Sequence, residues 1–361
     1  MRILVTGASG LLGREVARLL VRQGHDVATF QRRPSGVDGV TDRCGSLTDD
    51  KAVQGAVGGA EGIIHLAAKV SFTGRAAEFD EVNVEGTRRL LRLARAAGVR
   101  DLVFVSSPSV ANSGTAITGL GAELADPERA HGDYSRTKAE AELLALAADA
   151  PEFRVAAVRP HIVWGPGDTQ LVERVLARAR RNRLPLLDAG AALIDTTYVD
   201  NAASAIVAAL HRMDHVHGKA LVVSNGEPRP VGELIAGICT AGGVPAPSWA
   251  VPGRVARVAG AVVEKLWTWA GREEEPPMTR FLAEQLSTAH WFDQRDTQEL
   301  LNWRPAISLD QGLARLAAYY APGTLPGTRR SWTPTERALR PGNNGRISAA
   351  GLTDEADAGV Q

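Results

Sequence analysis

The chain begins Met1-Arg2-Ile3-Leu4-Val5-Thr6-Gly7-Ala8-Ser9-Gly10-Leu11-Leu12-Gly13, an apolar run followed by three glycines spaced three residues apart. The run has the composition of a buried strand, and the pattern after Gly10 is that of an amphipathic helix. The glycines therefore lie in the turn between strand and helix. There, glycine permits a tight bend and lets the backbone approach a pyrophosphate, which the helix N-terminus also attracts. The stretch predicts a dinucleotide-binding βα unit.

The same alternation of strand and helix continues along residues 1–160. Short apolar runs are separated by longer helical patterns, as in parallel strands joined by helices. Several runs are almost wholly apolar, which is typical of a sheet covered by helices on both faces. This predicts an α/β fold built on a Rossmann-type doubly wound parallel sheet. We expect strands at 2–6, 26–31, 62–66, 102–106 and 154–159, and helices at 11–23 and 81–97.

The pattern becomes less regular after residue 164, with isolated short strands such as 219–223 between helices and Pro/Gly turns. We expect residues 1–164 to form the NADP-binding domain and residues 165–320 to form a smaller C-terminal substrate-binding domain. Residues 321–361 are rich in Pro, Gly, Ser and Thr and have little apolar periodicity, which predicts a disordered tail.

Composition excludes several classes of protein. The 361 residues carry 41 Lys+Arg and 41 Asp+Glu, and zero net charge argues against a nucleic-acid partner. Cys44 and Cys239 are too few and too far apart for a disulfide framework or a thiol metal site, so we expect no metal and a reducing compartment. No run reaches the roughly 18 apolar residues of a membrane span. We therefore expect a cytoplasmic protein, at most peripheral to a membrane.

The end of the second expected strand bears on the choice of cofactor. NAD-binding proteins normally place an Asp or Glu there to bind the ribose 2′-hydroxyl, whereas Arg accommodates a 2′-phosphate. This chain has Gln31 in the place of the acid, followed by Arg32 and Arg33. Arg32 favours NADP(H) over NAD(H), and the alternative is that both arginines are merely solvated.

A tyrosine and a lysine are spaced for acid–base chemistry. Tyr134-Ser135-Arg136-Thr137-Lys138 begins an expected helix, and the spacing of four places Tyr134 and Lys138 on one face. A phenol with a pKa of about 10 is a weak acid–base at neutral pH. A neighbouring ammonium and a cationic nicotinamide favour the phenolate. Tyr134 is therefore a candidate proton donor or acceptor, and Lys138 can also hold the nicotinamide ribose.

Serine residues follow the expected strand at 102–106. Ser106, Ser107 and Ser109 lie at its carboxyl end, where open α/β sheets bind their ligands. One of these hydroxyls can hydrogen-bond a substrate carbonyl and orient it for hydride transfer. The alternative is that the serines only form the turn.

Together these residues resemble the extended short-chain dehydrogenase/reductases over about residues 1–320. The resemblance also rests on His65-Leu66-Ala67-Ala68, on Asn83-Val84-Glu85-Gly86-Thr87 and on Arg159-Pro160. It implies that Ser107 orients the substrate oxygen, Tyr134 transfers the proton, and Lys138 binds ribose and tunes Tyr134. It further implies a cofactor groove lined by Gly7, Ser9, Gly10, Leu11, Leu12, Gly13, Arg32, Leu66, Ala67, Ala68, Asn83, Tyr134, Lys138, Pro160 and Val163.

The stretch Arg159-Pro160-His161-Ile162-Val163-Trp164-Gly165-Pro166-Gly167-Asp168 resembles the 3β-hydroxysteroid dehydrogenase branch, which includes sterol-4α-carboxylate 3-dehydrogenases and bacterial 2-alkyl-3-oxoalkanoate reductases. This implies an oxidoreductase of lipid metabolism that reduces the 3-keto group of a 2-alkyl-3-oxoalkanoic acid. Alternatives are a steroid or sterol-4-carboxylate 3-dehydrogenase, a sugar-nucleotide epimerase or dehydratase, and a non-catalytic NADP-sensing protein. The Arg-Pro-His sequence counts against the epimerase, and the intact Tyr134 and Lys138 count against the sensor.

A substrate carboxylate in an apolar pocket needs a polar partner. Lys69 and His161 are the candidates for that contact, and Ser109 is a further candidate for substrate binding. The alternatives are a solvated loop lysine and a core histidine bonded to backbone.

Residues 254–269 predict an amphipathic helix. Val255, Val258 and Val262 fall on its apolar face, together with Trp267 and Trp269, and Arg254 and Arg257 lie opposite. Such a helix packs into a core, covers a pocket for alkyl chains, lies on a membrane surface or docks an enzyme of the same pathway. Beyond a lipid-like small-molecule substrate, a homodimer is a further expected partner.

Overall fold

The structure is a computed structural model that describes residues 1–70, 74–111, 115–269 and 280–321. The predicted tail lies outside the described residues from residue 322 onward. Among the described residues, no helix combines the length and apolar character needed to cross a membrane.

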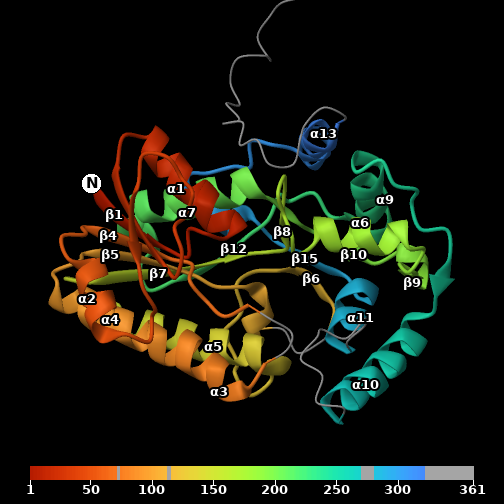
Figure 1. The fold of residues 1–361 in the computed structure, drawn as a ribbon, viewed down its shortest axis with the longest axis horizontal. Coiled ribbons are helices and arrows are strands. Elements are labelled where there is room, and N and C mark those ends of the chain that lie inside the picture. The colour runs from red at the N-terminus through yellow and green to blue at the C-terminus, as the bar shows by residue number, and fades with distance from the viewer. Residues whose placement is uncertain (71–73, 112–114, 270–279, 322–361) are drawn as a thin grey trace, which may run out of the picture. The chain divides into compact units, whose positions relative to one another are not determined.

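A parallel sheet forms the centre of the fold (Figure 1). Within the described residues it has seven strands in the order β12-β7-β5-β4-β1-β2-β3, and each neighbouring pair is parallel. Since β1 lies between β4 and β2, the strand order reverses at β1, and ligands of such sheets bind at the carboxyl ends beside that reversal. The strands are β1 (Arg2–Thr6), β2 (Asp26–Gln31), β3 (Thr41–Cys44), β4 (Gly62–His65), β5 (Asp101–Val105), β7 (Arg154–Pro160) and β12 (Ala220–Val223).

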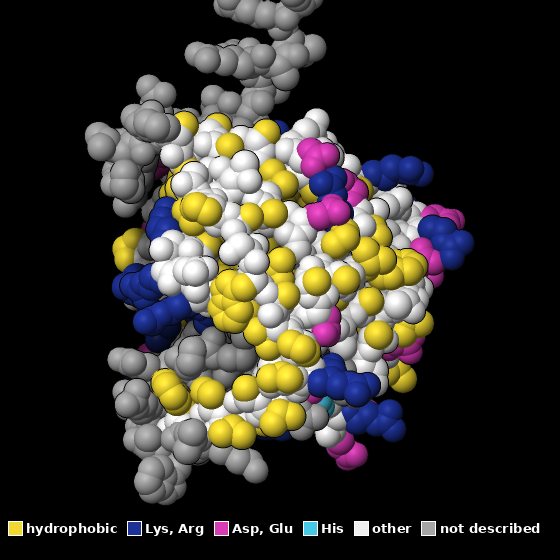
Figure 2. Space-filling view, turned by 90° about the vertical axis from the view of Figure 1, so that its right-hand side faces the viewer, with side chains coloured by type: hydrophobic (Ala, Val, Ile, Leu, Met, Phe, Trp, Pro, Cys, Tyr) yellow, Lys and Arg dark blue, Asp and Glu magenta, His cyan; other side chains and the backbone are white. Residues whose placement is uncertain are grey.

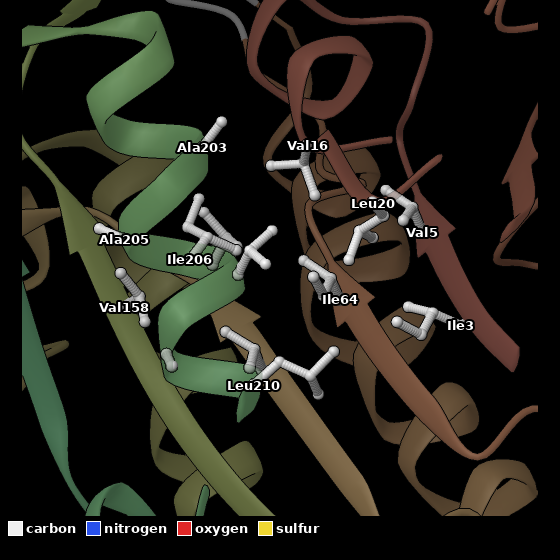
Figure 3. Packing of buried hydrophobic residues seen from close by; sticks show 14 of the residues in the cluster. Ile3, Val5, Val16, Leu20, Ile64, Val158, Ala203, Ala205, Ile206 and Leu210 are labelled. Atoms are coloured by element: carbon white, nitrogen blue, oxygen red, sulfur yellow. The ribbon is translucent and has the colours of Figure 1, made fainter. Parts of the chain in front are cut away.

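Helices cover both faces of this sheet, as the sequence predicts (Figure 1). The first face is covered by α1 (Leu11–Arg22) and α7 (Val199–His211). Their side chains Val16, Leu20 and Leu210 pack against strand residues in a common core, as Figure 3 shows. The opposite face is covered by α2 (Asp50–Val57), α4 (Gly86–Ala96) and α5 (Gly132–Ala147).

A second sheet and a helical cluster are formed mainly by the part of the chain after β7, joined by β6, which precedes β7. The sheet has the order β13-β10-β15-β6. A third core joins α6, α9 and α13 with the short strand pair β8–β11, while α10 and α11 pack with the short pair β9–β14. The elements are β6 (Ile117–Leu120), β8 (Val163–Trp164), α6 (Val172–Arg180), β9 (Leu186–Leu187), β10 (Leu193–Ile194), β11 (Thr197–Tyr198), α8 (Met213–Val216), β13 (Arg229–Pro230), α9 (Val231–Ala241), β14 (Ala250–Val251), α10 (Gly253–Trp269), α11 (Arg280–Ser287), β15 (His290–Phe292), α12 (Arg295–Leu301) and α13 (Leu309–Tyr320).

Three elements differ from the sequence-based expectation. The strand expected at 219–223 within the second part is instead β12, an edge strand of the main sheet that pairs with β7. β3 was not predicted, because its residues Thr-Asp-Arg-Cys lack apolar alternation. The helix expected at 81–97 begins earlier, as α3 (Ala76–Phe79), and passes through a π-helical segment, η1 (Asp80–Glu85), before α4.

Candidate active site

The glycine turn after β1 has no room for side chains. Gly7 has a φ of +77°, and a Cβ on it would lie 2.8 Å from the backbone nitrogen of Ala67. A Cβ on Gly13 would overlap the carbonyl oxygen of Gly7, which already accepts a hydrogen bond from the Gly10 amide at 3.1 Å. Ser9 and Gly10 are exposed, and Leu11 and Leu12 are partly exposed at the start of α1. This turn fits a dinucleotide pyrophosphate.

Replacing Gly13 should therefore damage cofactor binding. We expect Gly13→Ala to push α1 away from the turn and to raise the Kd for NAD(P)H by about tenfold to a hundredfold, as overpacking typically does. Fluorescence titration of the cofactor measures this. Gly55→Ala in α2 is the matched control, since a Cβ there meets nothing within 4 Å. Equal Kd values for the two variants would contradict the role of the turn.

A buried histidine connects this turn to the next strand. The Thr6 hydroxyl lies 2.7 Å from His65 Nδ1 and accepts a hydrogen bond from the Ala67 amide at 3.1 Å. His65 Nε2 lies 3.1 Å from the Thr87 hydroxyl, which itself donates to the Asn83 carbonyl oxygen at 2.6 Å. Because Thr87 uses its one proton on the Asn83 carbonyl oxygen, it accepts from Nε2–H of His65. In a neutral ring Nδ1 is then the acceptor, and Thr6 donates to it. Burial and the charge of Lys138 lower the pKa of His65 to about 3, so the ring is neutral.

Asn83 joins the loop after β4 to helix α5. Its Oδ1 accepts from the Lys69 amide at 2.7 Å, and its Nδ2 donates to the Thr137 hydroxyl at 3.0 Å. Asn83 lies in η1, and π-helical turns are frequent at functional sites. The clamp fixes Ala67 and Ala68, both partly exposed, next to the turn that contains Gly7. Leu66 is also partly exposed at this edge.

The Tyr134 and Lys138 side chains occupy the first two turns of α5. Lys138 Nζ donates to the Val105 carbonyl oxygen at 2.7 Å and lies 4.0 Å from the centre of the Phe104 ring. This contact holds α5 against the carboxyl end of β5, where Ser107 follows two residues later. Burial raises the pKa of Tyr134 to about 12 and lowers that of Lys138 to about 7. The phenol is therefore protonated at neutral pH, as a proton donor requires.

The depressed pKa of Lys138 makes stability depend on pH. A lysine in the unfolded chain has a pKa of about 10.4, so between about pH 7 and that value the unfolded state binds a proton that the native state lacks. This group then makes the free energy of unfolding rise by about 1.4 kcal/mol per pH unit. In Lys138→Met, without added cofactor, we expect a correspondingly shallower rise. Denaturant titrations at several pH values above 7 measure it, and parallel curves would contradict the depressed pKa.

The three serines after β5 have different environments. Ser106 is buried, and its hydroxyl has no hydrogen-bond partner among the described residues. Ser107 is partly exposed, and its Oγ accepts from the Ser109 hydroxyl at 3.1 Å and the Ser109 amide at 3.3 Å. Ser109 thus orients Ser107, which leaves the Ser107 proton available for a substrate oxygen.

Backbone strain marks the end of β7. Ile162 has a φ of +41°, which is rare for a β-branched residue, between Pro160 and Val163. The strained segment is held by Thr197, whose hydroxyl donates to the His161 carbonyl oxygen at 2.7 Å. Such strain persists where the surroundings impose it and is frequent at active sites.

The two residues expected to contact a substrate carboxylate have partners within the protein. His161 is buried, and its Nδ1–H donates to the carbonyl oxygen of Asp195. Burial and the neighbouring His290 lower the pKa of His161 to about 3, so it is a neutral ring and provides no positive charge. The Lys69 ammonium forms an ion pair with Glu78. A contact of either residue with a substrate stays a prediction.

A carboxylate from β3 lies beside the end of β2. Asp42 lies on β3, and its Oδ1 accepts from the Thr29 hydroxyl at 2.5 Å, the Gln31 amide at 2.9 Å and the Ser35 backbone at 3.0 Å. Desolvation opposes these bonds, but together they lower the pKa of Asp42. The carboxylate is therefore charged and bonded within the protein, while Arg32 is exposed at the strand end.

A buried ion pair joins α5 to β7. Arg159 on β7 donates through Nε to Glu142 Oε2 at 2.9 Å, and its Nη2 bonds the other carboxylate oxygen. The side chains are 2% and 1% exposed. Glu142 is one turn after Lys138 on α5, and Arg159 directly precedes Pro160. The pair thus connects the helix that carries Tyr134 and Lys138 to the strand that leads to the strained segment. The pair could not be predicted from the sequence. The spacing of four from Lys138 places Glu142 on the same helix face, but no local pattern indicates Arg159 as its partner.

Comparison with known proteins shows the family of the chain. The chain belongs to the NAD dependent epimerase/dehydratase family, whose model matches residues 3–224. It is 40% identical over 326 residues to the 2-alkyl-3-oxoalkanoate reductase of Stenotrophomonas maltophilia, covering 88% of this chain and 99% of that protein. The 2-alkyl-3-oxoalkanoate reductase of Shewanella oneidensis is 34% identical over 328 residues, with 87% and 85% covered.

Solved structures agree on the fold. MoeE5 in complex with UDP-glucose and NAD superimposes with a TM-score of 0.69 at 23% identity, covering 88% of this chain and 98% of that one. The predicted Rossmann-type sheet and the family resemblance are therefore confirmed.

Proposed function

We propose that this protein is an NADP-dependent reductase that converts the 3-keto group of a 2-alkyl-3-oxoalkanoic acid to the 3-hydroxy group. The observation that carries the proposal is the nearly full-length similarity to two reductases of that name, in a chain that keeps Tyr134, Lys138 and the glycine turn. A cytoplasmic location is part of the proposal, since both cysteines are free and Cys44 is exposed.

The described side chains supply the polar chemistry of such a reduction. A bound reduced nicotinamide would supply the hydride that adds to C3. Ser107, held by Ser109, donates a hydrogen bond to the keto oxygen and places C3 for that transfer. Tyr134 gives its proton to the same oxygen as negative charge develops on it. Lys138, charged when protonated, then stabilises the resulting phenolate.

An apolar hollow beside Ser107 supports a lipid-like substrate. It has a volume of about 80 Å³ and lies against Pro108, the residue that follows Ser107. Ile117, Leu120, Val222 and Phe292 supply most of its apolar lining, and Thr115, Glu123 and Arg159 line its polar part. Apolar surface of this kind favours an alkyl chain over a sugar, because a buried hydroxyl without a partner is costly.

Arg32 is the residue on which the preference for NADP rests. Exposed at the end of β2, it can pair with a 2′-phosphate that NADH lacks. We expect Arg32→Ala to raise the KM for NADPH about tenfold, the cost of one charge-assisted contact, and to leave the KM for NADH unchanged. NADH is the internal control. Equal effects on both cofactors would contradict the assignment.

The proposed reaction is tested by NADPH oxidation, followed by absorbance, with three substrates in parallel. We expect oxidation with a 2-alkyl-3-oxo fatty acid and none above background with a steroid 3-ketone or UDP-glucose. Turnover of the steroid alone would overturn the substrate assignment in favour of steroid dehydrogenation. Conversion of UDP-glucose in a parallel reaction with NAD⁺ or NADP⁺, without net reduction of that cofactor, would identify an epimerase.

A further inference from the structure

The first part of helix α10 exposes three valines and buries three small residues. Val255, Val258 and Val262 are 56%, 68% and 52% exposed. Gly253, Ala256 and Gly260 are buried instead. This is the reverse of an ordinary amphipathic helix, whose large apolar residues face the core.

The buried side of α10 is already occupied by the protein. Ala256 packs in a small core with Leu187 and with Ala283 of α11. The Gly253 amide donates to Asp188 Oδ1 at 2.8 Å, which fixes the beginning of the helix. The contacts of Gly253 and Ala256 on the buried side of α10 therefore keep the row of Val255, Val258 and Val262 facing outward. Figure 2 shows hydrophobic side chains gathered along the bottom of the molecule, where α10 lies in Figure 1.

The chain around this row is positively charged. Residues 174–187 contain five arginines and residues 242–263 contain two; Glu173 and Asp188 flank the first segment, and Asp188 Oδ1 accepts from the Gly253 amide. Strands β9 and β14 pair and so bring the two segments together. Arg180, Arg181, Arg183 and Arg254 are exposed, and Trp249, directly before β14, is 41% exposed. Glu264 is the next acid after Val263, and an acidic run at 273–275 lies outside the described residues.

We propose that these residues form a surface that binds an anionic lipid bilayer, with α10 lying in the plane of the interface. We call it the α10 surface; it consists of Trp249, Val255, Val258, Val262, Arg180, Arg181, Arg183 and Arg254. Valine and tryptophan side chains enter the boundary between headgroups and acyl chains, and arginines pair with anionic headgroups. Since no described helix can span a bilayer, the association is peripheral.

Charge favours a bilayer over a second copy of the chain. In a symmetric dimer through the α10 surface, the same patch of both copies would meet. Its arginines would then face a patch that carries arginines and no acidic residue. An anionic bilayer instead neutralises each arginine. The proposal is independent of the proposed reaction, because none of the α10 surface residues belongs to the candidate active site.

The test is flotation of the purified full-length protein with vesicles. We expect binding to phosphatidylcholine vesicles that contain phosphatidylglycerol, and much weaker binding to phosphatidylcholine alone. Val255→Ser/Val258→Ser and Arg180→Gln/Arg181→Gln/Arg183→Gln should each weaken binding by about tenfold or more. Retained binding of NADPH shows that the variants are folded.

Matched controls separate the α10 surface from general effects. Leu124→Ser removes another large exposed apolar residue, which is 88% exposed. Arg88→Gln/Arg92→Gln/Arg95→Gln removes three charges from α4, where these side chains are 54%, 59% and 54% exposed. Both controls should float as the wild type does. The proposal is overturned if the wild type does not bind vesicles, if test and control variants bind alike, or if the valine variant only dissociates a dimer.

Discussion

Tyr134→Phe should reduce kcat by about 10² to 10⁴, the usual contribution of a positioned general acid. The phenyl ring keeps the shape of the side chain and removes only the proton that the keto oxygen needs. Burial raises the pKa of Tyr134 to about 12, so the phenol is protonated at neutral pH and can donate its proton. Phenylalanine has no such proton, so the loss of kcat is not rescued. Kd for NADPH should change little if, as we propose, the glycine turn and Lys138 hold the cofactor.

Steady-state kinetics and cofactor fluorescence together measure these effects. Tyr319→Phe is the matched control, since Tyr319 is 42% exposed on α13 and loses the same atom. It should keep wild-type kcat. If Tyr134→Phe retains a kcat close to that of the control, Tyr134 is not the proton donor, and a sensor role for the protein gains support.

Arg159→Met should lower the free energy of unfolding by about 3–5 kcal/mol, which is typical when one partner of a buried ion pair is removed. Glu142 would be left charged in a site where its side chain is 1% exposed. The same substitution also removes the hydrogen bond from Arg159 Nη1 to the Glu123 carbonyl oxygen at 2.6 Å. Denaturant unfolding, followed by circular dichroism, measures the loss.

The double variant Arg159→Met/Glu142→Leu distinguishes charge from packing. Because it removes both charges, it should recover most of the stability lost in Arg159→Met. A double variant as unstable as the single one would show that the ion pair is not the cause. We also expect its kcat to fall, because Glu142 and Arg159 connect the helix of Lys138 to the strand that precedes Pro160.

Residues that act through local spacing could be predicted from the sequence. The strands at Arg2–Thr6 and Asp26–Gln31 and the position of the glycine turn follow from periodicity and from the geometry of glycine, and the structure has them as predicted. The four-residue spacing of Tyr134 and Lys138 likewise places them on one face of α5. These features need only neighbouring residues, so a single sequence contains them.

Features that depend on distant contacts could not be predicted. The hydrogen-bond chain from Thr6 through His65 to Thr87 joins three elements, and no local pattern indicates it. The edge strand β3 is polar and forms because β2 offers a free edge. On α10 the pattern correctly grouped the valines but could not show which face is buried, since that depends on α11.

The most direct test of the account follows the hydride itself. The wild-type protein is incubated with a 2-alkyl-3-oxo fatty acid and NADPH that carries deuterium at C4 of the nicotinamide, and the product is analysed by mass spectrometry and NMR. We expect one deuterium at C3 of a 3-hydroxy acid for each NADPH consumed, when the deuterium is on the face of the nicotinamide from which the hydride is transferred. A product without deuterium at C3, from either labelled face, would contradict it.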